Sequence, residues 1–323
     1  MNFAMMIDGC VQSSYYVKGG KSYKFGTDDP YIHYHSISNE CPLGLWGYPF
    51  LFEGYFINLT EFSNELPTLD LDLILVAIEK KPLEFNVQML RNKYPNATIV
   101  SFVKESHWIY STVQQRLEFF KSCDYNTFPW KINYDIEGGI NGIKTLSGLL
   151  GREVYYLPYP HNVQYLHDKY YKQDRDKKIL AYKSGDNRGQ STDFVDNIAK
   201  KYGLEVFQHI VKYKGDGHQQ WEEFLDGITS AMYCFNLSDR VYGGTMAVQC
   251  AALGILNIGG REDSHKALWE RTYTNDLLIL EHEFVDTFLD QSHYIDTIQK
   301  AYSNSIGIYS HNAVKKRLLN IIK

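Results

Sequence analysis

Apolar runs alternate with amphipathic segments along most of this chain, which is the pattern of an α/β protein. In the first half, we predict strands at 2–7, 71–78, 97–103, 125–129 and 154–157, and helices at 82–93, 111–122 and 141–150. The strand–helix–strand order from 71 to 103 predicts parallel pairing with a right-handed crossover. This half is therefore typical of a Rossmann-like domain.

A second series of the same kind follows a break that contains two prolines. Pro158 and Pro160 punctuate the segment 156–162, which indicates a linker between domains. Beyond it, we predict strands at 178–182, 205–211, 230–238 and 255–260, and helices at 192–201, 221–225, 245–253 and 314–322. We therefore expect one domain at 1–160, a second at 161–305 and a C-terminal helical segment at 306–323.

One stretch follows neither pattern. The residues between the first strand and about Tyr48 are rich in Gly, Ser, Tyr and His, and we predict a loop that is long enough to be functional. Within it, Gly19 and Gly20 either make a hairpin turn or let the backbone approach a phosphate.

Composition narrows the possible functions. The chain has 323 residues and a formal net charge of -5, so it lacks the overall positive charge of many nucleic-acid-binding proteins, although a local basic groove is compatible with this value. Its five cysteines are widely spaced and odd in number, which favours reduced thiols and a cytoplasmic location. No apolar run has the length of a membrane span, and no Cys/His cluster or His-Glu-x-x-His pattern predicts a metal site.

The densest chemical signal is a glycine turn that opens a helix of small residues. The run reads Asp239-Arg240-Val241-Tyr242-Gly243-Gly244-Thr245. Gly243 and Gly244 let the backbone approach a ligand closely, and the free amides at the helix start, from Gly244 to Met246, suit a phosphate dianion. Thr245 adds a hydroxyl. The alternative is that the two glycines only turn a strand into a helix that lies close to a sheet.

The elements around this turn resemble the donor half of GT-B-fold glycosyltransferases, the glycogen-synthase-like or group 1 superfamily. A strand at 230–238 leads into the turn, and the helix 245–253 contains Gln249-Cys250-Ala251-Ala252-Leu253-Gly254, which matches the Glu-Ala-x-Ala-x-Gly part of the family pattern. The resemblance implies an α/β fold of two Rossmann-like domains facing across a cleft, with acceptor binding in the first domain and nucleotide-sugar binding in the second. It also implies that the C-terminal helix packs back toward the first domain.

The chain departs from the family pattern at two acidic positions. The register set by Gly254 puts Gln249 where many retaining members carry their second glutamate, and Val241 where they carry the first. Gln249 can still hydrogen-bond a ribose or sugar hydroxyl, and Arg240 and Tyr242 beside the turn are further donor-binding candidates. The missing acids leave retention or inversion of the anomeric centre open.

A second constellation follows the first strand of the second domain. The loop there carries the cations Lys183 and Arg188. Ligands of open α/β sheets bind at the carboxyl ends of the strands, so this loop is placed to contact the donor. The resemblance implies that these cations hold the diphosphate leaving group and make a metal unnecessary. The simpler interpretation of Arg188 alone is a solvated loop charge.

Two residues of the first domain are candidates for the catalytic base. Asp8 ends the first strand, and His107 follows the strand at 97–103. Either side chain would deprotonate an acceptor hydroxyl. The structural alternative for His107 is a capped or packed histidine at a strand end.

The sequence therefore favours a glycosyltransferase that moves a sugar from a nucleotide-sugar, such as a UDP-sugar, to an acceptor hydroxyl without a metal or other cofactor. The composition is rich in Asn, Ile, Lys and Tyr, as in proteins of AT-rich phage or viral genomes. In that case the location is the host cytoplasm, and a hydroxymethylated DNA base is an acceptor candidate beside a glycan. Two alternatives stay open: a nucleotide-sugar epimerase, and a catalytically silent module that binds a nucleotide-sugar or glycan.

Overall fold

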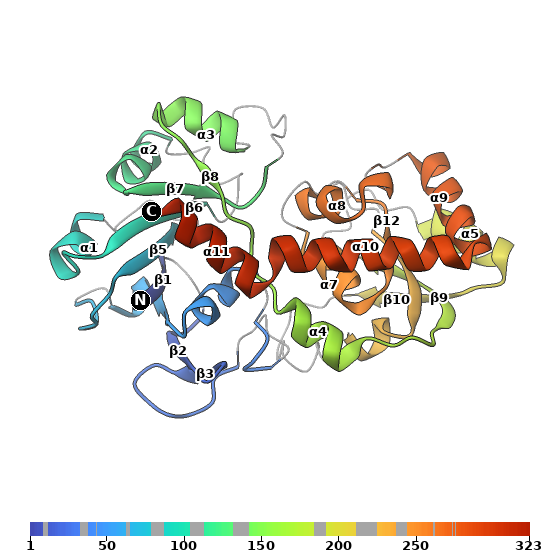
Figure 1. Cartoon of the computed structure of the whole chain (residues 1–323), viewed down its shortest axis with the longest axis horizontal. Coiled ribbons are helices and arrows are strands. Elements are labelled where there is room, and N and C mark those ends of the chain that lie inside the picture. Colours follow the sequence, from blue (N-terminus) through green and yellow to red (C-terminus); the bar gives the residue numbers. More distant parts are fainter. Residues whose placement is uncertain are drawn as a thin grey trace. The chain divides into compact units, whose positions relative to one another are not determined.

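The computed structural model forms two compact units (Figure 1). It describes residues 1–8, 12–32, 38–42, 44–62, 65–78, 87–103, 113–131, 142–183, 192–210, 225–236, 244–260, 262–272, 274 and 276–323. Within these residues, the first unit holds 1–32, 38–160 and 311–323, and the second holds 161–310. Among the described residues, the chain passes between the units after Pro160 and after Ser310.

The first unit is built on an eight-stranded mixed sheet with the order β3-β2-β4-β1-β5-β6-β7-β8. The strands are β1 Phe3–Asp8, β2 Tyr15–Lys18, β3 Lys21–Lys24, β4 Tyr55–Asn58, β5 Leu73–Ile78, β6 Thr98–Val103, β7 Tyr125–Phe128 and β8 Tyr155–Tyr156. The six strands from β4 to β8 in this order are parallel, whereas β2 pairs antiparallel with β3 and β4. The central strands β1 and β5 are buried apolar runs, as parallel strands covered on both faces require.

Among the described residues, four α-helices and two 3₁₀ helices, Gly44–Leu51 and Leu59–Phe62, accompany this sheet. They are α1 Val87–Lys93, α2 Val113–Ser122, α3 Ile143–Leu150 and α11 His311–Ile321. On α11, Val314, Leu318 and Ile321 recur at the spacing of one helix face and are buried. They share one core with Met5 of β1 and Leu75 of β5, so α11 is part of the first unit's core.

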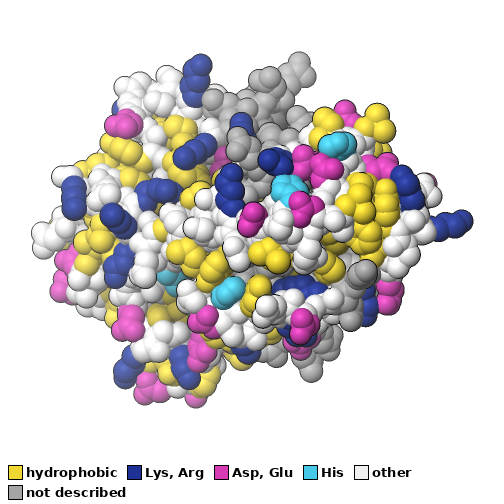
Figure 2. Space-filling model, turned by 45° about the vertical axis from the view of Figure 1, so that its right-hand side comes forward, with side chains coloured by type: hydrophobic (Ala, Val, Ile, Leu, Met, Phe, Trp, Pro, Cys, Tyr) yellow, Lys and Arg dark blue, Asp and Glu magenta, His cyan; other side chains and the backbone are white. Residues whose placement is uncertain are grey.

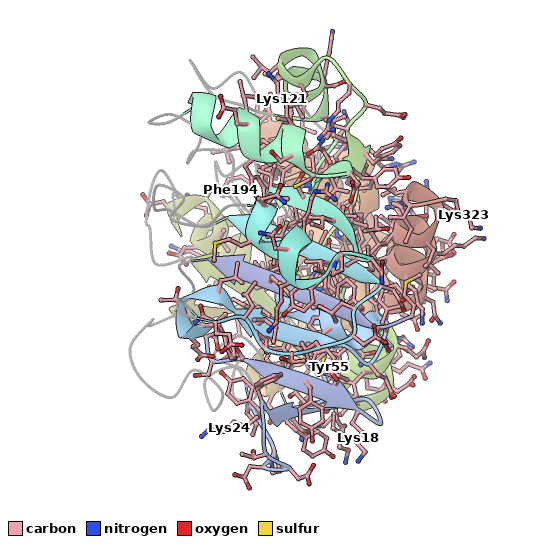
Figure 3. The ribbon with its side chains drawn as sticks, turned by 90° about the vertical axis from the view of Figure 1, so that its left-hand side faces the viewer. Lys18, Lys24, Tyr55, Lys121, Phe194 and Lys323 are labelled. Atoms are coloured by element: carbon pink, nitrogen blue, oxygen red, sulfur yellow. The ribbon has the colours of Figure 1, made fainter. Side chains whose placement is uncertain are left out.

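The stretch predicted as a long loop contains a β-hairpin. β2 and β3 are joined by Gly19 and Gly20, whose φ angles of +58° and +73° are those of a two-residue hairpin turn. The prediction was wrong because these strands are four residues long and rich in tyrosine and lysine, so they form no apolar run. Figure 3 shows Lys18 and Lys24 of the hairpin together with Tyr55 of β4 at this edge of the sheet.

The second unit holds a four-stranded, fully parallel sheet with the order β10-β9-β11-β12. The strands are β9 Asp176–Lys183, β10 Glu205–Ile210, β11 Ala231–Phe235 and β12 Leu256–Ile258. The named helices are α4 Val163–Tyr170, α5 Thr192–Tyr202, α7 Thr245–Leu253, α8 Asp263–Leu268, α9 Leu277–Leu289 and α10 Gln291–Tyr309. All four strands were predicted, whereas α4, α8, α9 and α10 were not.

Helix α7 lies at the centre of this unit, in contact with α4, α8 and α10 (Figure 1). Every residue from Met246 to Leu253 is buried, which small side chains such as Ala247 and Ala251 allow because neighbouring helices approach closely. The helix ends at Gly254, which has φ +70° and whose added Cβ would meet the Tyr171 ring. Gly254 is therefore a left-handed C-cap that only glycine fits.

Candidate functional site

The candidate site of the second unit lies at the carboxyl ends of its parallel strands, where open α/β sheets bind ligands. β11 continues into Asn236, whose backbone N–H still donates to Ile258 O of β12 at 2.9 Å. On the other side of β11, Ala181 of β9 pairs with Phe235, so β9 ends two residues later, at Lys183, on the same edge of the sheet. Helix α7 begins at this edge.

Gly244 shapes the start of α7. It is the N-cap residue, with φ 33° and ψ 66°, and it offers no side chain to cap the helix. A Cβ added there would clash with Ser264 Oγ and would lie 2.8 Å from Glu262 Cβ, so only glycine fits. The amides of the first helical turn, beginning at the half-buried Thr245, therefore stand at a helix N-terminus that favours an anion.

Gln249 lies one turn further along α7. Its side chain is fully buried, and within the described part of the chain neither Oε1 nor Nε2 has a hydrogen-bond partner. Leaving a buried polar group unpaired costs about 1–3 kcal/mol, so such groups are rare and call for an explanation. Gln249 stands four residues after Thr245 on the same helix face, and helical side chains lean toward the N-terminus. Its amide can both donate to and accept from hydroxyl groups of a ligand.

A cluster of buried polar side chains supports the start of α7. Both Oε1 and Oε2 of Glu262 lie 3.2 Å from Asn236 Nδ2, which donates to them, and Ser264 Oγ donates to Gly244 O at 2.7 Å. Asn236, Glu262 and Ser264 are each less than 10% exposed. These contacts join the ends of β11 and β12 to the N-cap of α7.

A closed chain of hydrogen bonds lies behind this cluster. Asn257 Nδ2 donates to His265 Nδ1 at 3.1 Å, so the ring proton sits on Nε2, which donates to Thr272 Oγ1 at 2.7 Å. Thr272 Oγ1 in turn donates to Asn257 O at 3.1 Å. Burial lowers the pKa of His265 from 6.5 to about 3, so this histidine is neutral at physiological pH and acts as a structural element.

Asn236, Glu262 and Ser264 were not predicted as site residues from the sequence. A signal for them was present, because Gly259 and Gly260 end a predicted strand and a polar run follows directly. What could not be seen was that this run folds against the glycine turn, which lies some twenty positions earlier in the sequence.

The structure describes five of the ten predicted site residues at least in part. Gly244, Thr245 and Gln249 come together on α7, as above. Lys183 and Asp8 each end a strand, at the carboxyl edges of the second and first sheets, and only their backbones are described. The other predicted site residues lie outside the described residues: His107, Arg188, Arg240, Tyr242 and Gly243.

Two further observations concern metals and membranes. Among the described residues, no group of three or more His, Cys, Asp or Glu side chains is placed to hold a metal ion. In the same residues, no helix has both the length and the apolar character needed to cross a bilayer.

Comparisons with known proteins gave matches in structure only. No protein-family model matches the sequence, and no curated protein matches it. The N-terminal domain of trehalose-6-phosphate phosphatase from Candida albicans superposes with a TM-score of 0.54 at 14% identity, over 85% of this chain and 72% of that chain.

Two other solved structures match at lower TM-scores. One is a Listeria monocytogenes protein assigned as a UDP-N-acetylglucosamine 2-epimerase, with a TM-score of 0.45 and 12% identity over 78% of this chain and 74% of that chain. The other is AviGT4, a glycosyltransferase involved in avilamycin A biosynthesis, with a TM-score of 0.40 and 10% identity over 98% and 96%.

At these identities the likeness concerns the fold alone. The chain has the α/β, GT-B-like fold that its sequence predicts, with a mixed sheet in one unit and a parallel sheet in the other. Activity has to be argued from the residues of the site.

Proposed function

We propose that this protein is a glycosyltransferase that takes a nucleotide-sugar, in the first instance a UDP-sugar, and transfers the sugar to an acceptor hydroxyl without an essential metal. The second unit would bind the donor, with its diphosphate at the start of α7. The first unit would bind the acceptor.

The observation that carries the proposal is the pairing of an uncapped helix N-terminus with an unpaired buried amide on the same helix face. Gly244 leaves the first amides of α7 open to a phosphate, and Gln249 offers a donor and an acceptor to a sugar or ribose hydroxyl. A nucleotide-sugar carries both groups, charged phosphates next to hydroxylated rings. The resemblance of the 230–260 segment to the donor half of GT-B enzymes supports the same ligand class.

The reaction needs a base and a stabilised leaving group. The acceptor oxygen attacks the anomeric carbon, the bond from that carbon to the β-phosphate oxygen breaks, and the nucleoside diphosphate departs with the electron pair. In the proposal, the amides at the start of α7 and the cations Lys183, Arg188 and Arg240 hold its charge. The acceptor proton goes to Asp8 or His107. The carboxylate of Asp8 and a neutral imidazole of His107 are both able to act as this base.

The acceptor class is the least constrained part of the proposal. A glycan hydroxyl and the hydroxyl of a hydroxymethylated DNA base present the same nucleophile, an alcohol. The formal net charge of -5 favours the glycan, because a DNA-binding surface needs local positive charge against this background. Transfer from a radiolabelled UDP-sugar to each acceptor, in the presence of EDTA, distinguishes the two.

The donor site is tested most directly by ligand-induced stabilisation. A ligand that binds only the native state raises the unfolding temperature. We expect UDP and one UDP-sugar to stabilise the wild type, and Gln249→Met to reduce this stabilisation. Gln299→Met, an exposed position on α10, is the matched control and should leave it unchanged. No shift with any of a panel of nucleotides and nucleotide-sugars would contradict the donor site.

A catalytically silent module remains the second candidate, because the chain lacks both family glutamates and has Val241 and Gln249 in their places. Such a module binds the donor as the enzyme does, so binding cannot separate the two. Release of UDP from a bound UDP-sugar, with or without acceptor, separates them: the silent module releases none, an epimerase converts the sugar into its isomer, and the transferase releases UDP.

A further inference from the structure

A cavity lies in the same unit, away from the candidate donor site. It has a volume of about 380 Å³ and is bounded by α8, the 3₁₀ turn Glu270–Thr272, α9 and α10. Leu256, the first residue of β12, and Trp269 give it a buried apolar wall. The donor site lies at the opposite, carboxyl end of β12. A volume of this size falls within the usual range of small-molecule sites, roughly 300–1,000 Å³.

Charged side chains of both signs line this cavity. Arg271 and Lys300 bring two positive charges, and Glu283 and Asp296 bring two negative charges. In the described part of the chain none of these four makes a salt bridge, although Asp296 and Lys300 stand four residues apart on α10, a spacing that permits one. Figure 2 shows basic, acidic and histidine side chains gathered on this face.

The cavity is also lined by neutral polar side chains of α10. Arg271 Nη1 donates to Nε2 of His293 at 3.2 Å, which fixes that guanidinium at the rim. Thr297 and Asn304 follow His293 on the face of α10 that lines the cavity. Hydroxyl and amide groups at this spacing suit a ligand that carries several hydroxyls.

We propose that this cavity binds a small zwitterionic ligand of the amino sugar phosphate class. Arg271 and Lys300 would hold its phosphate, and Asp296 and Glu283 its ammonium group. A simple anion would meet the two carboxylates and a simple cation the two basic side chains, whereas a zwitterion of matching polarity satisfies all four. This inference is independent of the proposed transferase activity.

The cavity is joined to the core of the unit by two of its lining residues. Trp269 Nε1 donates to Ala247 O of α7 at 3.2 Å, and Thr272 Oγ1 accepts from Nε2 of the buried His265. A ligand that contacts Trp269 and Thr272 therefore also stabilises the contacts that these two residues make with α7 and α8. Binding should consequently raise the unfolding temperature of the whole unit.

The test uses three probes, of which the first carries both charged groups, the second only the phosphate and the third only the ammonium: glucosamine 6-phosphate, glucose 6-phosphate and glucosamine. Calorimetric titration of the full chain should give the tightest binding for glucosamine 6-phosphate, and each probe with only one of the two charged groups should bind at least about tenfold more weakly, as the loss of a charge-assisted contact predicts. Saturating UDP should not displace the ligand, because the donor site is separate.

Two variants assign the charges. Arg271→Gln should weaken both phosphate probes about tenfold and leave glucosamine unchanged, and Asp296→Asn should weaken both amino probes by a similar factor. Lys121→Gln, an exposed position on α2 of the first unit, is the control and should change nothing. The proposal is overturned if glucose 6-phosphate binds as tightly as glucosamine 6-phosphate, if neither variant changes affinity, or if no probe binds at millimolar concentration.

Discussion

Two fully buried amide side chains, Asn126 in the first unit and Gln249 in the second, differ in whether the protein satisfies their hydrogen bonds. With its amide group oriented to suit its neighbours, Asn126 donates to Ser101 Oγ and Phe120 O and accepts from the guanidinium of Arg152. Gln249 has no partner for either amide atom among the described residues.

The difference separates polar groups that stabilise a fold from those that await a ligand. Asn126 ties β6, β7, α2 and the loop after α3 together, and its hydrogen bonds are made within the protein. Gln249 brings an energetic penalty of about 1–3 kcal/mol into the core of the second unit. A polar residue that destabilises its own fold is the more informative one about function.

The largest expected effect comes from breaking the satisfied network. Asn126→Ala removes the partner of Ser101 Oγ and the acceptor of Arg152 Nε, although Arg152 Nη2 still donates to Phe120 O and Cys123 O, so we expect a loss of about 3 kcal/mol in the free energy of unfolding. Urea unfolding measures it, with Asn92→Ala on the exposed face of α1 as the control. Affinity for UDP should be unchanged. A loss no larger than that of the control would mean that the network is not what holds these strands.

Gly244→Ala tests the geometry of the other region. Its φ of 33° and the clash of a Cβ with Ser264 predict a loss of about 2 kcal/mol and a displaced start of α7. Gly307→Ala on α10 is the matched control: nothing lies within 4 Å of its added Cβ, and alanine in a helix should stabilise by about 0.5–1 kcal/mol. Opposite signs for the two variants in thermal unfolding are expected, and equal effects would contradict the left-handed cap.

The pH dependence of stability sharpens the comparison through His265. Nδ1 of His265 accepts from Asn257 Nδ2 only when the ring is neutral, and burial holds the pKa of His265 at about 3 in the folded state against an ordinary 6.5. The unfolded chain therefore binds the proton first, and stability is lost as the pH falls from 6.5 toward 3. One pH unit in this window corresponds to about 1.4 kcal/mol. His265→Gln should remove this part of the slope, and an unchanged slope would exclude His265 as its source.

The smallest change in stability should come from Gln249→Met. Methionine has a similar shape and no unpaired amide, so we expect the free energy of unfolding to rise by about 1 kcal/mol while the stabilisation by UDP is reduced. Denaturant unfolding with and without UDP measures both. A destabilised variant would show instead that the amide of Gln249 has a partner within the protein.

The strands of the parallel sheet, and β1, β5, β6, β7 and β8 of the mixed sheet, could be predicted because buried parallel strands are continuous apolar runs, whereas β4 was not predicted. The strands β2 and β3 were not predicted, since they owe their place to pairing at a sheet edge, although the hairpin turn that was one of the two interpretations of Gly19 and Gly20 is confirmed. Gly244 and Gln249 could be predicted as site residues from the glycine turn and the helix that follows it. The role of Glu262 could not be predicted from the sequence, because Glu262 contacts Asn236 only where two separate loops meet at one sheet edge.

Helices α9 and α10 illustrate a second reason for missed structure. Each begins at an aspartate: Asp276 accepts from the backbone N–H groups of Leu278 and Ile279, and Asp290 from those of Ser292 and His293. These caps are local signals that could have been found. The apolar positions of α9 obscure them, because Leu277, Leu278 and Ile279 are exposed and break the amphipathic pattern.

The double passage of the chain between the units has a consequence for biosynthesis. The first unit needs Val314, Leu318 and Ile321 for its core, and these residues leave the ribosome after the whole of the second unit. During synthesis from the N-terminus, all residues of the second unit are therefore available for folding before the first unit has its last helix. Until then, one face of the sheet of the first unit is uncovered. In that interval the apolar face around Met5 and Leu75 is exposed to chaperones and to other nascent chains.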